Sequence, residues 1–263
     1  MLLSMDTGVS ALEQFQQQIN VIANNIANVN TVGFKQADVN FEDTLSETLG
    51  ANAAGSTQVG TGVATASITN DFGTPGSITS TGIQSNLAID GNGFFVVKDP
   101  VSGNSYVTQD GSFSTDQNGY LVTSGGLRLQ GTNGDLQIAG SSTATVSSYT
   151  ISSNGTVTVN LSDGTTSSPG QITLQSYSNP DQLVKDGNNL YTAPATAGGL
   201  AAAVAPGTSG LGTLESGYLE MSNVDLAGQL TDLIAAQQAY SANSKVISTS
   251  DNVMQTLVNL IQG

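Results

Sequence analysis

The chain has 263 residues, of which 10% are charged and 5% aromatic, and it contains no cysteine, histidine or tryptophan. Without cysteine or histidine it cannot form disulfides, thiolate or imidazole metal sites, or the nucleophilic sites that pair serine or cysteine with histidine. Twenty acidic and five scattered basic residues give a formal net charge of −15, so we expect no nucleic-acid partner. We also expect no metal or cofactor, because histidine and cysteine are absent and the candidate aspartates lie beside Gly or Asn in predicted turns.

The sequence has no apolar run as long as the roughly 20 residues that a membrane-spanning helix requires. Its first residues, Met1 to Asp6, lack both the basic segment and the long apolar segment of a secretory signal. We therefore expect no membrane insertion and no cleaved signal peptide.

The first predicted element is an amphipathic helix from about Ser4 to Val29. Its apolar residues recur at steps of 3, 4, 3, 4 and 3, which places them in one narrow row on an α-helix that needs a helical partner. The other faces are rich in Asn and Gln, and we expect these amides to form interhelical hydrogen bonds in a crowded, neutral bundle. The row consists of Leu12, Phe15, Ile19, Ile22, Ile26 and Val29.

Residues 35–58 are predicted to be a linker, because Gly50 to Ser56 is rich in Gly, Ala and Asn and shows no periodicity. From Val59 onward, short apolar segments alternate with Gly and Asn turns. This pattern predicts a domain of antiparallel strands over residues 59–221. Hairpin turns are predicted at Asn154-Gly155 and between Asp90 and Gly93.

The last predicted element is a long helix over residues 222–263, with Ser222 and Asp225 at the spacing of an N-cap. Its main apolar row consists of Leu226, Leu230, Leu233, Tyr240, Ile247, Met254, Leu257 and Ile261. A second row beside it consists of Ala239, Val246, Val253 and Leu260. The combined stripe is wider than a two-stranded coiled coil requires, so we expect it to contact helices from more than one molecule.

Together these elements predict an α+β fold. The N-terminal helix, within residues 1–34, pairs with the C-terminal helix in a coiled-coil-like layer, and the antiparallel β-rich domain is inserted between them. The two predicted rows form the candidate assembly interface.

Four stretches, in the same order along the chain, resemble the bacterial flagellar axial proteins, the family of rod, hook and hook-associated subunits. Ala23 to Lys35 resembles the N-terminal signature of that family, and the stretch from Asn86 to Phe95 also agrees. The other two are Asp110 to Phe113 with Asn118-Gly119, and Leu219 to Leu226 leading into Ala242 to Ile247. The signature residues are Asn24, Asn25, Asn28, Asn30, Gly33 and Phe34.

The resemblance implies a structural subunit and not an enzyme. It implies that copies of the chain polymerise into a helical tube, with the terminal helices as its inner layer, and that the tube contacts neighbouring rod, hook or hook-associated proteins. It also implies export through the flagellar type III apparatus to a place in the hook or basal body outside the cytoplasm.

Within the family we favour a short hook protein, on the basis of Val59 to Val63 after a short spacer and of the chain end from Gln255 to Leu260. The alternative is the distal rod protein of the basal body, which the length favours because hook proteins usually carry a further outer domain. An alternative from another class is a secreted adhesin or glycan-binding β-protein with helical tails. Self-assembly would separate this last alternative from an axial protein.

Overall fold

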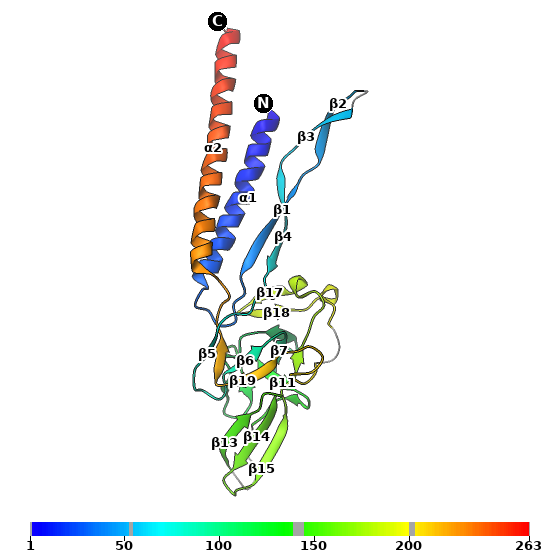
Figure 1. The fold of residues 1–263 in the computed structure, drawn as a ribbon, viewed down its shortest axis with the longest axis vertical. Helices are drawn as coiled ribbons and strands as arrows, with labels where there is room; N and C mark the ends of the chain where they lie inside the picture. Colours follow the sequence, from blue (N-terminus) through cyan, green and yellow to red (C-terminus); the bar gives the residue numbers. More distant parts are fainter. Residues whose placement is uncertain (1, 53–54, 139–144, 200–202, 263) are drawn as a thin grey trace. The chain divides into compact units, whose positions relative to one another are not determined.

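The structure is a computed structural model that describes residues 2–52, 55–138, 145–199 and 203–262. Helix α1 (Leu2–Ala27) begins the chain and helix α2 (Leu226–Gln262) ends it, with antiparallel strands between them in the sequence (Figure 1). The two helices pack against each other. This arrangement confirms the predicted α+β fold with paired terminal helices and an inserted β-rich region.

The chain forms two compact units. Unit 1 contains Met1–Asn28, Gln36–Asn70 and Val224–Gly263, and unit 2 contains Val29–Lys35 and Asp71–Asn223. These limits differ from the predicted domains, because residues 36–70 associate with the helices and residues 29–35 with the β-rich region.

The helices of unit 1 run antiparallel. Gly8 of α1 lies against Ile247 of α2, and Asn25 bonds to Gln229. At about 1.5 Å per residue, α1 is about 39 Å long and α2 about 56 Å. The last turns of α2 therefore extend past the start of α1 (Figure 1).

The described parts of residues 36–70 form the strands of a long β-hairpin in unit 1 and not the predicted linker. Strand β1 (Ala37–Asp43) pairs with β4 (Val63–Asn70), and further along the hairpin β2 (Ser46–Asn52) pairs with β3 (Gly55–Gly60). Helix α1 packs on β1 and β4, where the rings of Phe15 and Phe41 meet edge to face at 6.3 Å. The sequence analysis missed these strands because their composition is largely polar. A polar composition is possible here because only one face of the hairpin packs against a helix.

Among the described residues of unit 2, the largest sheet is antiparallel and has nine strands. In spatial order they are β17 (Val184–Gly187), β18 (Leu190–Thr192), β8 (Ser105–Thr108), β7 (Phe94–Lys98), β11 (Arg128–Gly131), β10 (Leu121–Val122) and β9 (Ser114–Thr115), with β12 (Gly134–Asp135) on β11 and β16 (Leu174–Gln175) on β7.

Smaller groups of strands complete unit 2. Two pairs join residues far apart in the sequence: β6 (Leu87–Asp90) with β19 (Thr213–Ser216), and β5 (Ile78–Ser80) with β20 (Tyr218–Glu220). A three-stranded sheet consists of β13 (Val146–Ile151), β14 (Thr156–Leu161) and β15 (Thr166–Gln171), and the short 3-10 helices are Pro180–Gln182 and Ala195–Ala197.

The two predicted hairpins have different outcomes. The hairpin at Asn154-Gly155 is confirmed, because β13 and β14 pair across it. The prediction of a hairpin between Asp90 and Gly93 is wrong, because the flanking strands β6 and β7 do not pair with each other. Strand β6 pairs with β19, and β7 pairs with β8 and β11. A turn-forming composition indicates that the chain changes direction, but it does not indicate with which strand the next segment pairs.

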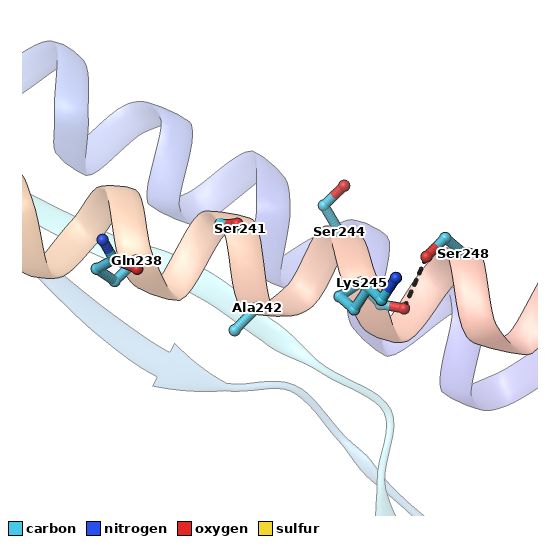
Figure 2. Close-up of a pocket in the computed structure, with 6 residues that line it drawn as sticks. All are labelled: Gln238, Ser241, Ala242, Ser244, Lys245 and Ser248. Carbon is cyan, nitrogen blue, oxygen red and sulfur yellow. Dashed lines mark hydrogen bonds between the residues drawn. The ribbon is translucent and has the colours of Figure 1, made fainter.

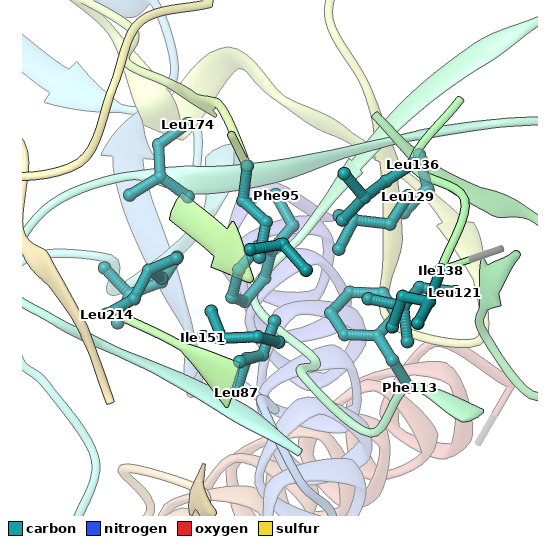
Figure 3. Packing of buried hydrophobic residues seen from close by; sticks show 14 of the residues in the cluster. Leu87, Phe95, Phe113, Leu121, Leu129, Leu136, Ile138, Ile151, Leu174 and Leu214 are labelled. Carbon is teal, nitrogen blue, oxygen red and sulfur yellow. The ribbon is translucent and has the colours of Figure 1, made fainter. Parts of the chain in front are cut away.

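The main core of unit 2 gathers apolar side chains from several of these strands (Figure 3). Phe95 lies at its centre, fully buried, with its ring edge to face against Phe113 at 5.2 Å. A second cluster surrounds Tyr191, whose ring meets Phe72 edge to face at 5.2 Å. Burial of these aliphatic and aromatic side chains stabilises unit 2.

Tyr191 makes unit 2 sensitive to alkaline pH. Its side chain is 1% exposed, its hydroxyl has no hydrogen-bond partner among the described residues, and burial raises its pKa to about 12. The folded pKa exceeds the unfolded value of about 10, so the unfolded chain releases this proton first as the pH rises. The contribution of the neutral Tyr191 side chain to the unfolding free energy is therefore complete below about pH 10 and is lost as the pH rises toward 12.

We expect the wild type to lose about 1.4 kcal/mol more of its unfolding free energy between pH 9 and pH 11 than Tyr191→Phe does. Equilibrium urea unfolding of both proteins at the two pH values measures this difference. Equal losses in the two proteins would show that the Tyr191 hydroxyl does not titrate in this way.

Candidate assembly interface

The predicted row on α1 faces the interior of unit 1. Ile22 is buried, and Leu12, Phe15, Ile19 and Ile26 are half-buried. The sixth predicted member, Val29, lies outside the helix and belongs to unit 2. Helix α1 ends at Ala27, where the Asn28 amide is shared between the carbonyls of Asn24 and Asn25, as is common at helix ends.

Only some members of the predicted row on α2 face α1. Leu233, Ile247 and Met254 are half-buried on the face that packs against α1. Four other members are exposed to 43, 45, 37 and 42%, namely Leu226, Leu230, Tyr240 and Leu257. The side chain of Ile261 lies outside the described part of the structure.

The prediction missed the other half of the α2 row that faces α1. Between its large apolar residues lie smaller or polar residues at seven-residue intervals, and they are buried or half-buried: Gln229, Ala236, Asn243 and Ser250. Small side chains also appear on α1, where a Cβ added to Gly8 would lie 3.0 Å from Ile247 Cγ1. The two helices therefore approach closely, which a row of large apolar residues would prevent.

Asn25 connects α1 with two other elements of unit 1. Its side chain is 1% exposed, and its Nδ2 donates to the carbonyl of Ala37 and to Oε1 of Gln229, both at 2.9 Å. Its Oδ1 accepts the Ala37 amide at 3.0 Å. A buried amide costs free energy unless it is hydrogen-bonded, so these partners favour one register of α1 against both β1 and α2.

Three family profiles match successive parts of the chain. "Flagella basal body rod protein" matches residues 5–35, and "Flagellar hook protein FlgE/F/G D1 domain" matches residues 88–159. "Flagellar basal body rod FlgEFG protein C-terminal" matches residues 215–260. The first and last of these cover most of the two helices.

Full-length relatives extend this similarity. The flagellar basal-body rod protein FlgG of Bacillus subtilis is 42% identical over 269 residues, which cover 99% of this chain and 99% of that protein. The chain belongs to the flagellar rod and hook protein family. FlgG of Buchnera aphidicola subsp. Acyrthosiphon pisum, another family member, is 37% identical over 99% of this chain and 100% of that protein.

A hook protein of the family matches over a shorter region. The flagellar hook protein FlgE of Borreliella burgdorferi is 41% identical over 140 residues, which are 50% of this chain and 31% of that protein. The flagellar rod and hook family consists of structural proteins and not enzymes, so this chain is a structural protein of the flagellum.

The described residues add two observations about the site. No helix among them is long and apolar enough to cross a membrane. Nowhere in the same part of the chain do three His, Cys, Asp or Glu side chains gather as they would around a metal ion.

The signature of the flagellar rod and hook family spans both units. Asn24 and Asn30 are exposed, Asn28 is half-buried and bonds through Nδ2 to the Asn24 carbonyl at 2.9 Å, and Asn25 holds the junction described above. Gly33 and Phe34 are buried in unit 2. The signature therefore contains residues that are buried in unit 1 and residues that are buried in unit 2.

Lys35, the last residue of the stretch that carries the signature, forms a buried ion pair that the sequence analysis missed. Lys35 Nζ lies 2.8 Å from Oε1 of Glu220, and the two side chains are 2% and 5% exposed. One signal was available, because Lys35 is the only basic residue before Lys98. Its partner could not be inferred, because the pair joins positions 185 residues apart.

Asn25→Leu tests the junction in unit 1. The substitution leaves the Ala37 backbone groups and the Gln229 amide buried without partners, and each such group costs about 1–3 kcal/mol. We expect the helix pair of Asn25→Leu to unfold at clearly lower urea concentration, with Gln229→Leu in the same chain recovering part of the loss.

Circular dichroism at 222 nm during urea unfolding measures this effect. The matched control is Asn24→Leu, whose exposed side chain should change stability by no more than about 0.5 kcal/mol. Equal effects of the two single variants would mean that the Asn25 bonds do not hold the helix pair.

Proposed function

We propose that the chain is the distal rod protein of the flagellar basal body, a subunit of the tube that transmits torque from the motor to the filament. The observation that carries this proposal is the similarity to FlgG proteins over 99% of both chains. A hook protein matches over only 31% of its own length, so the remaining two thirds of it has no counterpart in that alignment.

The favoured prediction of a short hook protein has weaker support than the distal rod alternative. One of its arguments was the segment Val59 to Val63, which in the structure joins β3 to β4 within the long hairpin of unit 1. That segment has a structural role that does not depend on membership of the hook class. The length argument, which favoured the rod alternative, agrees with the full-length FlgG relatives.

Polymerisation is supported by apolar side chains on α2 that α1 leaves exposed. Val246, Val253 and Leu260 are 47, 48 and 73% exposed and recur every seven residues, as the predicted second row does. No charged residue belongs to this row. A seven-residue repeat is the spacing at which another helix packs, so a helix from a second copy fits this row. Repetition of such a heterologous contact builds an open helical assembly.

Another face of α2 is polar (Figure 2). A shallow groove there is lined by small and polar side chains together with Lys245, whose carbonyl accepts the Ser248 hydroxyl at 2.9 Å. Lys245 is the only basic residue in unit 1, which carries nine acidic residues. A carboxylate of a neighbouring copy is therefore a favourable partner for Lys245, while the uncharged row offers packing.

The proposal includes partners that follow from the assignment as a rod protein. We expect the subunit to reach its place through the flagellar type III export apparatus and to contact other rod, hook or hook-associated proteins at the ends of its own polymer. An adhesin or a glycan-binding protein would instead remain a discrete species in solution.

Val253→Asp tests the uncharged row of α2. A carboxylate in a packed helical interface loses its hydration without gaining a partner, so we expect polymerisation at fixed concentration to fall at least tenfold. The matched control is Gln237→Asp, which adds the same charge at an exposed position of α2 outside both this row and the groove beside Lys245.

Sedimentation of polymer measures both variants, and circular dichroism confirms that each keeps its helices. Wild-type polymer yield from Val253→Asp would exclude this row as a contact between copies.

Antibody labelling of intact flagella purified from the source organism tests the distal rod assignment. We expect label on the rod segment of the basal body and none along the hook in electron micrographs. Label along the hook would overturn the assignment and restore the hook alternative.

A further inference from the structure

Residues 29–35 follow α1 in the chain, yet they belong to unit 2. The Gly33 amide donates to the carbonyl of Glu220 at 2.8 Å. Gly33 has φ +65°, and a Cβ added to it would lie 2.7 Å from the backbone nitrogen of Asp110. Only glycine satisfies both the conformation and the close approach, so this position is built to lie against unit 2.

Side chains on both sides of Gly33 add to this contact. Asn189 Nδ2 donates to the Val32 carbonyl at 2.7 Å. Phe34 is buried, and Lys185 Nζ lies 4.8 Å from the centroid of its ring. These contacts hold the segment by its backbone and by an apolar anchor, as a short peptide ligand is held.

The Lys35–Glu220 ion pair closes the contact. Lys35 Nζ also donates to the Thr74 carbonyl at 3.2 Å, and Oε1 of Glu220 also accepts the Gly76 amide at 2.8 Å. Both charges are buried, so removal of one would leave the other buried without an opposite charge.

The segment that leads into α2 reaches the same place. Asn223 Nδ2 donates to the Asp71 carbonyl at 3.0 Å and to the Thr74 carbonyl at 3.1 Å. The Thr74 carbonyl thus accepts from Lys35 on one end of the chain and from Asn223 on the other. We call the contacts of Gly33, Lys35, Glu220 and Asn223 the clip.

We propose that the clip closes independently of the helix pair and so holds the two ends of the chain together in the free subunit. Every residue in its contacts belongs to unit 2. None of these bonds requires α1 and α2 to be paired.

Chain connectivity then keeps the two helices close to each other. Helix α1 ends eight residues before Lys35, and α2 begins six residues after Glu220. Extended, these connections reach at most about 28 Å and about 21 Å. Such short tethers give each helix an effective concentration in the millimolar range relative to the other. The two helices therefore pair within one chain, at the register that Asn25 and Gln229 favour. The benefit of this arrangement for polymerisation rests on the proposed function, whereas the clip itself does not.

Hydrogen exchange of the full-length monomer, read residue by residue by NMR, tests the proposal. Ile22→Asp places an unpaired charge at a buried position of α1 in the interior of unit 1. We expect the α1 amides to exchange at least a hundredfold faster in this variant, while the Gly33 amide keeps its wild-type rate within tenfold. If Gly33 loses protection together with α1, the clip depends on the helix pair and the proposal fails.

The converse variant opens the clip. In Lys35→Gln we expect the Gly33 amide to exchange at least a hundredfold faster while the amides of β7 keep their rates. The matched control, Lys98→Gln, removes an exposed lysine of unit 2 and should leave Gly33 unchanged. Unchanged protection of Gly33 in Lys35→Gln would overturn the role of the ion pair.

If Lys35→Gln unfolds unit 2 as a whole, the double variant Lys35→Met with Glu220→Gln is measured in its place. The double variant removes both buried charges and keeps a side-chain oxygen that accepts the Gly76 amide. We then expect Gly33 to exchange at least tenfold faster in a folded unit 2, and an unchanged rate would overturn the proposal. Because exchange is measured on monomers, failure here leaves the rod assignment intact, and label on the hook leaves the clip intact.

Discussion

The structure of unit 1 depends on one buried amide, Asn25, which bonds to the backbone of β1 and to the side chain of Gln229 on α2. Water cannot replace these partners, so α1, the hairpin and α2 have to adopt one relative register or leave polar groups unsatisfied. A chain whose core row includes Gln, Asn and Ser cannot obtain that specificity from apolar packing alone.

The helix pair is closely packed but incomplete. The α2 face toward α1 alternates small or polar residues with large ones, and apolar residues remain exposed elsewhere on α2. Isolated helices gain most of their stability from packing, so a pair with this much exposed apolar surface is stabilised further when copies associate.

The family signature had appeared as one motif but serves two units. Asn25 acts within unit 1, whereas Gly33 and Lys35 act within unit 2, where the clip also holds Asn223 from the other end of the chain. Similarity to full-length FlgG proteins, and not the local motifs, supports the proposed rod assignment, because a hook protein shares half of this chain with comparable identity.

The sequence by itself determined the features that follow from local backbone geometry: two terminal helices with apolar rows, a β-rich region between them and the hairpin at Asn154-Gly155. Periodicity of 3.6 or 2 and a turn that needs glycine are visible within a few residues. Tertiary structure alone decided which face of α2 meets α1, that the predicted linker contains strands β1 and β2 and the start of β3, that β6 pairs with β19, and that Lys35 pairs with Glu220. Each of these depends on which distant groups become buried together, and desolvation at such contacts leaves no periodic trace in the sequence.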